Sequence, residues 1–160
     1  LAIRHPEKVK ALVLANTTSS YSGMGREAIG QRIATVEAHG LHAISTNTMT
    51  RFFSEEFRAT QAATVSRHQR LLESTDPEGY TACAAALCEA NTTARLGQIR
   101  VPTLVMAASN DISTPVETAY ALTKSIAGSQ MITLQGCAHL SAVEQPQAFA
   151  AVVGEFVAGV

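Results

Sequence analysis

The sequence predicts an α/β fold in which a mainly parallel sheet is interrupted by a long helical insertion. Short apolar runs typical of buried parallel strands occur at residues 9–15, 101–107 and 130–134. The second and third runs are each followed by a helical pattern, and strands that alternate with helices favour a parallel sheet. Residues 16–98, between the first two runs, carry no strong strand signal. We therefore expect a small sheet in which a long helical insertion separates the first two strands in sequence and a single helix separates the last two.

Composition narrows the class of protein. The 160 residues suit one ordinary domain, and a hydrophobic share of 46% is enough for a sizeable core. The formal net charge is −1 and no charge run stands out, which argues against nucleic acid or an anionic membrane as a partner. No apolar run reaches the roughly 18 residues of a membrane span, and no metal-binding pattern occurs. We expect no cofactor and no metal.

The three cysteines indicate whether the protein works in a reducing or an oxidising compartment. Cys83, Cys88 and Cys137 are odd in number and irregular in spacing, and no pair has C-x-x-C spacing. This pattern predicts free thiols in a reducing cytoplasm.

The N-terminal segment predicts a helix end followed by a strand. Residues 1–5 have the pattern of a last helical turn, and Pro6 ends it because proline disfavours helical geometry in the residue before it. A buried strand follows at 9–15. The chain has no initiator Met, so we expect it to be part of a longer protein.

The long middle region predicts several short helices. Residues 16–25 are polar and rich in Gly and Ser, and a broken helical pattern runs from about 26 to 96. Ser54 and Asp76 are expected to cap two of these helices, the second with Pro77 at its first position.

The C-terminal region returns to alternating strands and helices. After the strand at 101–107, Thr114-Pro-Val-Glu117 predicts a capping box and a helix from Pro115 to about Ile126. After the strand at 130–134, Ser141-Ala-Val-Glu144 predicts a second capping box. Pro146 begins a closing helix with one apolar stripe.

Three parts follow from this order of elements. Residues 1–16 and 99–160 are expected to form the sheet domain, and residues 17–98 a helical lid inserted between them.

Two polar residues are predicted at the carboxyl ends of strands, where open α/β sheets build their sites. Asp111 follows the strand at 101–107, and His139 follows the strand at 130–134. Acid before histidine is the chain order of one class of Ser-His-Asp hydrolases, in which the carboxylate orients the imidazole and the imidazole removes a proton from the nucleophile. The alternatives are a turn aspartate in Asn110-Asp111 and a buried neutral histidine with a backbone partner.

No nucleophile accompanies this pair. The motif G-x-S-x-G is absent from the 160 residues. Ser22, Ser109, Ser113 and Cys137 are rejected because none of them is predicted on a turn between a strand and a helix of its own.

Four stretches resemble α/β-hydrolases, and within them the C-terminal portion of 3-oxoadipate enol-lactonases. LAIRHPEKVKALVLANT at 1–17 is similar to the segment after the nucleophile helix, and PEGYTACAAAL at 77–87 to a lid helix of enol-lactonases. IRVPTLVMA at 99–107, continuing to Thr114-Pro115, resembles the acid strand and its loop, and HLSAVEQP at 139–146 the histidine loop. The lid helix and the Val-Glu-Gln-Pro ending favour enol-lactonase.

The resemblance implies a partial α/β-hydrolase fold and a cofactor-free mechanism. It implies that His139 is the base, that Asp111 orients it, and that the serine lies about ten residues upstream of Leu1. Arg32 is a candidate for binding a substrate carboxylate, with a solvated helix arginine as the alternative. The absence of Trp departs from relatives, which often carry one near the first lid helix.

The implied activity is hydrolysis of a small lactone, the opening of 3-oxoadipate enol-lactone to 3-oxoadipate. The alternatives are another hydrolase of this fold (esterase, C–C hydrolase or cofactor-free haloperoxidase) and a non-catalytic binding module. By itself the chain is expected to be inactive for want of a nucleophile. It is also expected to self-associate, or to pair with the missing N-terminal half, through an exposed strand edge.

Overall fold

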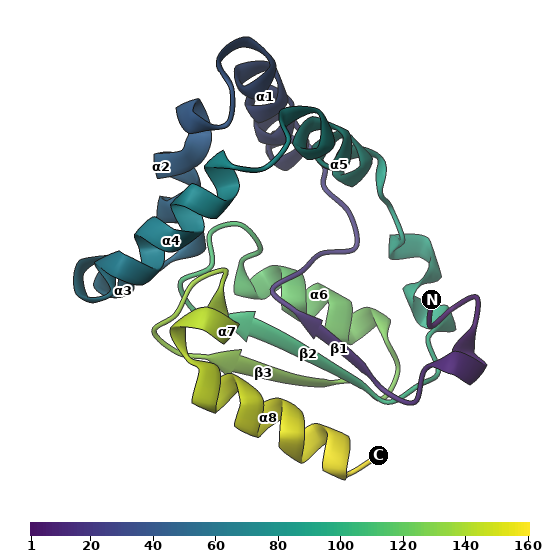
Figure 1. The fold of residues 1–160 in the computed structure, drawn as a ribbon. Coiled ribbons are helices and arrows are strands. Elements are labelled where there is room, and N and C mark those ends of the chain that lie inside the picture. The colour runs from purple at the N-terminus through teal and green to yellow at the C-terminus, as the bar shows by residue number, and fades with distance from the viewer.

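The structure of the chain is a computed structural model that describes residues 1–160, and its centre is a three-stranded parallel sheet (Figure 1). The strands are β1 (Leu12–Ala15), β2 (Thr103–Ala108) and β3 (Gln130–Leu134), in the order β1-β2-β3. In register, Leu14 pairs with Val105, which pairs with Met131. Because β2 is central and covered on both faces, all six of its residues are buried, which explains why every residue after Thr103 is apolar.

The remaining elements surround this sheet. In chain order they are η1 (Pro6–Lys8), α1 (Met24–His39), α2 (His42–Phe52), α3 (Glu55–Thr60), α4 (Ala62–Glu73), α5 (Pro77–Glu89), η2 (Thr93–Gln98), α6 (Val116–Ser125), α7 (Ser141–Glu144) and α8 (Pro146–Ala158).

Alternate residues of β2 face two separate cores. Val105 packs with Leu122 of α6 on one face, and Met106 packs with Phe156 of α8 on the other. Figure 1 shows α6 and α8 on opposite sides of the sheet. This follows from the period of two along a strand, and it holds the carboxyl ends of β2 and β3 in fixed positions.

Helices α1 to α5 form a group of their own on one side of the sheet (Figure 1). Within the group α1 packs against α5 and α2 against α4.

Two caps were correctly predicted from the sequence. Ser54 Oγ accepts a hydrogen bond from Phe57 N, and Asp76 Oδ2 accepts one from Gly79 N with Pro77 at the first helical position. The predicted absence of strands from this region is confirmed apart from one isolated bridge between Ser20 and Asn91.

The N-terminal prediction was partly wrong. Residues 1–5 form a turn closed by a hydrogen bond from His5 N to Leu1 O, and Pro6 begins the short 3-10 helix η1 instead of only ending a helix. Proline fits the first position of such a helix, because it has no N–H to leave unpaired. The first strand begins at Leu12, three residues later than predicted. None of the helices combines the length and the apolar character needed to cross a membrane.

Candidate active site

Asp111 and His139 lie side by side at the carboxyl ends of β2 and β3. Asp111 is 3% exposed, and its Oδ2 is 2.9 Å from Nδ1 of His139. The imidazole side chain is 22% exposed. With Nδ1 bound to the carboxylate, Nε2 is left without a partner in the chain and can exchange a proton with a third group.

The Asp111 carboxylate is held by a dense set of donors. Its Oδ1 accepts the N–H groups of Ser113 and Thr114 at 2.8 and 3.0 Å. Its Oδ2 accepts the Thr114 hydroxyl at 2.7 Å and the amide of Asn16 at 3.0 Å, besides His139. Burial by itself raises the pKa of Asp111, but the hydrogen bonds from His139 and Thr114 outweigh it and hold that pKa well below its usual value. The carboxylate is therefore built to stay ionised.

Both predicted capping boxes were wrong, and the same physical reason applies to each. The Thr114 hydroxyl donates to buried Asp111, and α6 begins at Val116 without a side-chain cap. The Ser141 hydroxyl donates to Asn16 Oδ1 at 2.6 Å, and α7 is uncapped as well. Acceptors in the site take up these two buried hydroxyls, because an unpaired buried polar group costs more than a frayed helix end.

Glu144, the last residue of the second box, joins the histidine loop to the helical group. One carboxylate oxygen accepts the N–H groups of Ala138 and Ser54 at 2.8 and 3.1 Å, and the other accepts the Ser54 hydroxyl. A backbone hydrogen bond from Leu140 N to Phe52 O, 2.9 Å long, runs beside it. These contacts fix the end of α2 against the loop that carries His139.

Phe52 covers one face of the His139 ring. The two ring centroids are 5.5 Å apart, and the ring planes differ by 28°. Stacking on an aromatic ring restricts the orientation of the imidazole.

No serine or cysteine of the chain is hydrogen-bonded to His139. The hydroxyl of Ser113 accepts a hydrogen bond from Arg51. The hydroxyl of Ser109 donates to Asn110 Oδ1 and accepts from the N–H of Gly136. Cys137 is fully buried, and burial, together with the charge of Glu144, raises the pKa of its thiol to about 11. The fourth rejected residue, Ser22, makes no side-chain hydrogen bond.

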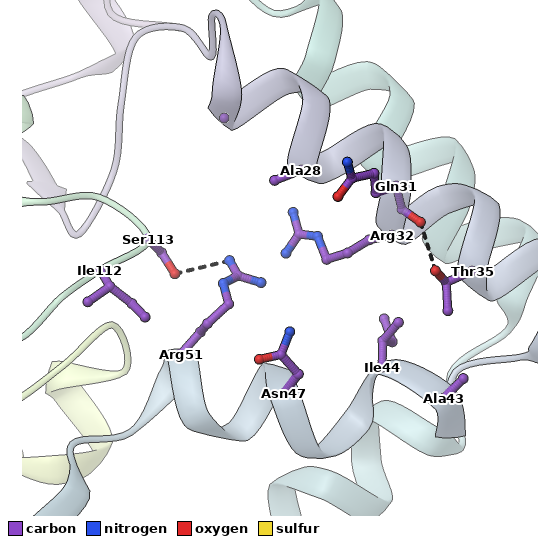
Figure 2. Close-up of a pocket in the computed structure, with 11 residues that line it drawn as sticks. Ala28, Gln31, Arg32, Thr35, Ala43, Ile44, Asn47, Arg51, Ile112 and Ser113 are labelled. Carbon is purple, nitrogen blue, oxygen red and sulfur yellow. Dashed lines mark hydrogen bonds between the residues drawn. The ribbon is translucent and has the colours of Figure 1, made fainter.

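A pocket of about 410 Å³ opens between α1, α2 and the Asp111 loop (Figure 2). We call it the arginine pocket. Its lining consists of Gly25, Ala28, Gln31, Arg32, Thr35, Ala43, Ile44, Asn47, Arg51, Ile112 and Ser113. Figure 2 shows the guanidinium groups of Arg32, from α1, and Arg51, from α2, both directed into this space. The volume suits a small ligand.

The two arginines are incompletely paired. Arg51 Nη2 donates to Ser113 Oγ at 3.0 Å, whereas Arg51 Nη1 and Arg32 Nε are buried without a hydrogen-bond partner. No other side-chain nitrogen or oxygen in the chain is buried and unpaired. Burial, and then the charge of Arg32, lowers the pKa of Arg51 from its ordinary value. Two cations facing one cavity with unused donors make a site for an anion, and carboxylate geometry matches them.

Arg32 was predicted from the sequence, whereas Arg51, Asn16 and Phe52 were not. Asn16 had a usable signal, because it directly follows a strand, and Asp111 likewise lies just past the carboxyl end of one. Arg51 and Phe52 had none, since their position next to the site depends on how α2 packs against the strand ends. No group of three or more His, Cys, Asp or Glu side chains is placed to hold a metal ion.

Comparisons with known proteins identify the family of the chain. The family model for the alpha/beta hydrolase fold matches residues 1–146. The chain is 34% identical over 149 residues to 3-oxoadipate enol-lactonase 2 of Acinetobacter baylyi, covering 93% of the chain and 55% of that relative. It is 31% identical over 126 residues to enol-lactonase 1 of the same organism, covering 79% of the chain and 47% of the relative.

Solved structures give the same result. The enol-lactonase from Burkholderia xenovorans LB400 superposes with a TM-score of 0.94 at 25% identity, covering 99% of this chain and 60% of that one. A hydrolase from Pseudomonas aeruginosa PA01 superposes with a TM-score of 0.90 at 31% identity, covering 98% and 58%. The chain thus spans about half the length of the curated relatives it matches. The resemblance and the fold predicted from the sequence are confirmed, and the chain belongs to the alpha/beta hydrolase fold family.

Proposed function

We propose that this chain is the acid–base and lid portion of a serine-type lactone hydrolase that opens 3-oxoadipate enol-lactone. The observation that carries the proposal is the pair of buried, unpaired arginine nitrogens in a pocket next to the Asp111–His139 pair. Ile112 and Ser113 directly follow Asp111 and line the pocket, and Arg51 directly precedes Phe52, which stacks on His139. An anion bound in the arginine pocket therefore lies close to the acid–base pair.

The proposed substrate supplies such an anion. 3-Oxoadipate is a dicarboxylate, and closing one carboxyl group onto its enol oxygen leaves the second carboxylate free. In the proposal this free carboxylate binds Arg32 and Arg51, while the lactone carbonyl lies at the His139 side. The enol-lactonases named among the relatives support the choice of lactone.

The proposed reaction uses a serine outside these 160 residues. His139 Nε2 removes the proton of that serine hydroxyl as the oxygen attacks the lactone carbonyl, and Asp111 stabilises the imidazolium that forms. The ring C–O bond then breaks, the enol oxygen takes the proton from His139, and an acyl-enzyme remains. Water, activated by His139 in the same way, releases 3-oxoadipate after the enol has become the ketone.

The same proposal assigns roles to the helical region and to the edge of the sheet. Residues 17–98 act as the lid, and the missing N-terminal segment pairs with the chain along the outer edge of β1. The chain alone is inactive, the enzyme needs no cofactor, and it works in the cytoplasm, where its three unpaired cysteines stay reduced.

A pair of lactones tests the proposal on the protein encoded by the complete reading frame. The first is 3-oxoadipate enol-lactone, and the second is α-angelica lactone, in which a methyl group replaces the carboxymethyl group. We expect kcat/KM to be at least about tenfold higher for the anionic lactone, because hydrogen bonds to a charged group contribute about 1.5–3 kcal/mol each. Equal values for both lactones, or faster hydrolysis of simple esters or C–C substrates, would contradict it.

A further inference from the structure

A second chain of hydrogen bonds runs from Asp111 away from His139. Asn16 Nδ2 donates to Asp111 Oδ2 at 3.0 Å, and Ser141 Oγ donates to Asn16 Oδ1 at 2.6 Å. The three residues come from the end of β1, the loop after β2 and the start of α7, which meet beside the sheet in Figure 1. The positions of Asn16 and Ser141 are 125 residues apart in sequence.

The direction of the Asn16 amide is fixed by its two partners. A carboxylate only accepts hydrogen bonds, so the NH₂ group must face Asp111, and the carbonyl oxygen then receives the Ser141 hydroxyl. Ser141 is 2% exposed and its hydroxyl makes no other hydrogen bond. A flipped amide would direct its oxygen at the carboxylate and leave a buried hydroxyl unpaired.

The backbone at Asn16 is also specialised. Its φ is +46°, and no other residue of the chain except glycine has a positive φ. Asparagine tolerates this left-handed conformation better than most residues. The conformation turns the chain sharply at the end of β1 and brings the side chain to Asp111.

Asn16 differs from the other donors to the carboxylate. Ser113 and Thr114 belong to the turn that carries Asp111, so they move with it. Apart from His139, Asn16 is the only donor that reaches the carboxylate from outside this turn. It can therefore fix the carboxylate relative to the sheet.

We propose that Asn16, itself oriented by Ser141, is a positioning residue that holds the Asp111 carboxylate in line with Nδ1 of His139. This inference rests on the proposed function, because the alignment matters to the reaction only if His139 is the base. Asn16 does not touch the reacting atoms. It acts through Asp111, and Ser141 acts through Asn16.

The test compares Asn16→Gly with a matched control in the complete protein. Glycine removes the amide and adopts a positive φ without strain, so folding is retained. We expect kcat about ten- to a hundredfold lower with KM within about twofold, as for a small misplacement of a catalytic group. The control is Asn110→Gly, which removes an exposed amide of the Asp111 loop whose one side-chain hydrogen bond is with Ser109, and we expect kcat close to that of the unmodified protein.

Ser141 supplies a second, independent arm. Ser141→Ala should lower kcat less than Asn16→Gly does, and the double variant should be no slower than Asn16→Gly alone, because both side chains act along one path. Additive losses in the double variant would show that Ser141 acts separately and would overturn the relay.

A spectroscopic readout separates this inference from the proposed function. The proton on Nδ1 of His139, hydrogen-bonded to Asp111, should give a strongly downfield NMR signal in protein labelled at histidine. We expect the signal to shift upfield or broaden in Asn16→Gly and to stay unchanged in Asn110→Gly. An unchanged signal and kcat, with only the melting temperature lowered, would overturn the positioning role. If the complete protein hydrolyses no lactone but the signal changes as expected, only the proposed function fails.

Discussion

Asp111, on the loop after β2, and Arg51, near the end of α2, are both charged and largely enclosed side chains, yet their hydrogen bonding is opposite. Asp111 accepts five hydrogen bonds, from Asn16, Ser113, Thr114 and His139. Arg51 donates one from its side chain, to Ser113, and keeps a buried nitrogen without a partner. Folded proteins pair nearly all buried polar groups, so an unpaired one needs a reason. The protein itself satisfies the hydrogen bonding of the aspartate, whereas the arginine has a nitrogen whose hydrogen-bond acceptor a ligand can supply.

This difference predicts two kinds of defect. Changes at the acid–base pair should affect the rate of the chemical step for every substrate. Changes in the arginine pocket should affect only substrates that carry an anion. The experiments below test that separation in the complete protein.

The largest effect is expected at the acid–base pair. His139→Ala should lower kcat about 10⁴-fold or more on both the anionic and the neutral lactone, because the nucleophile loses its base. Asp111→Asn should lower it by a similar order, since an amide can hold the wrong tautomer of the imidazole. Steady-state kinetics on both lactones measure this. His42→Ala is the control, because His42 is an exposed helix residue that pairs with Glu73. A loss of less than about tenfold in His139→Ala would show that another group is the base.

The next effect concerns the arginine pocket. Arg51→Met should raise KM for 3-oxoadipate enol-lactone about ten- to a hundredfold, the value of one lost charged hydrogen bond. Arg32→Met should act in the same direction. Neither should change KM for α-angelica lactone. Arg67→Met, an exposed arginine of α4, is the matched control.

Arg51 also holds Ser113 beside Asp111, so its loss could disturb the acid loop. The two lactones separate the causes. A disturbed loop lowers kcat for both substrates equally, whereas a lost anion site lowers kcat/KM only for the charged one. Equal losses for both lactones would contradict the anion site.

A smaller effect is expected where α2 touches His139. Phe52→Leu removes the ring that stacks on His139 at 5.5 Å. Aromatic contacts of this kind contribute about 0.5–1.5 kcal/mol, which corresponds to a two- to tenfold lower kcat. Phe57→Leu is the control, because Phe57 stacks on Phe53 and not on His139. If the two variants lost the same activity, the effect would come from general loosening of the helices.

The sequence predicted the parts of this site that depend on local rules. The strand ends located Asp111 and His139, because residues that follow parallel strands gather at one edge of the sheet. The same rule applied to the first strand would have found Asn16. Helix starts such as Ser54 and Asp76 were also predictable, since their side chains bond within three residues.

The features of the site that were predicted wrongly or missed depend on contacts between distant segments. Thr114 and Ser141 have the local pattern of helix caps, but in the folded chain their hydroxyls donate to the side chains of Asp111 and Asn16. No local pattern distinguishes Arg51 from a solvated helix arginine, because its burial arises only when α2 packs beside the Asp111 loop. At these positions tertiary contacts, and not local sequence preference, determine what each side chain binds.

The smallest effect is a dependence of stability on pH that arises from Asp111. The pKa of this carboxyl in the folded protein lies well below the ordinary value of 3.8. Its ionisation therefore stabilises the fold above about pH 4, and this contribution is lost as the pH falls from there through the folded pKa. Asp111→Asn removes the ionising group, so the gap in free energy of unfolding between the two proteins should be widest at neutral pH and should narrow below pH 4. Urea unfolding at pH 7, 5, 4 and 3 measures that gap.

Thr114→Val sharpens the comparison, because losing one hydroxyl donor raises the folded pKa of Asp111 and moves the loss of stability to higher pH. A gap that stays constant from pH 7 to pH 3 would mean that the five hydrogen bonds do not favour the ionised carboxylate.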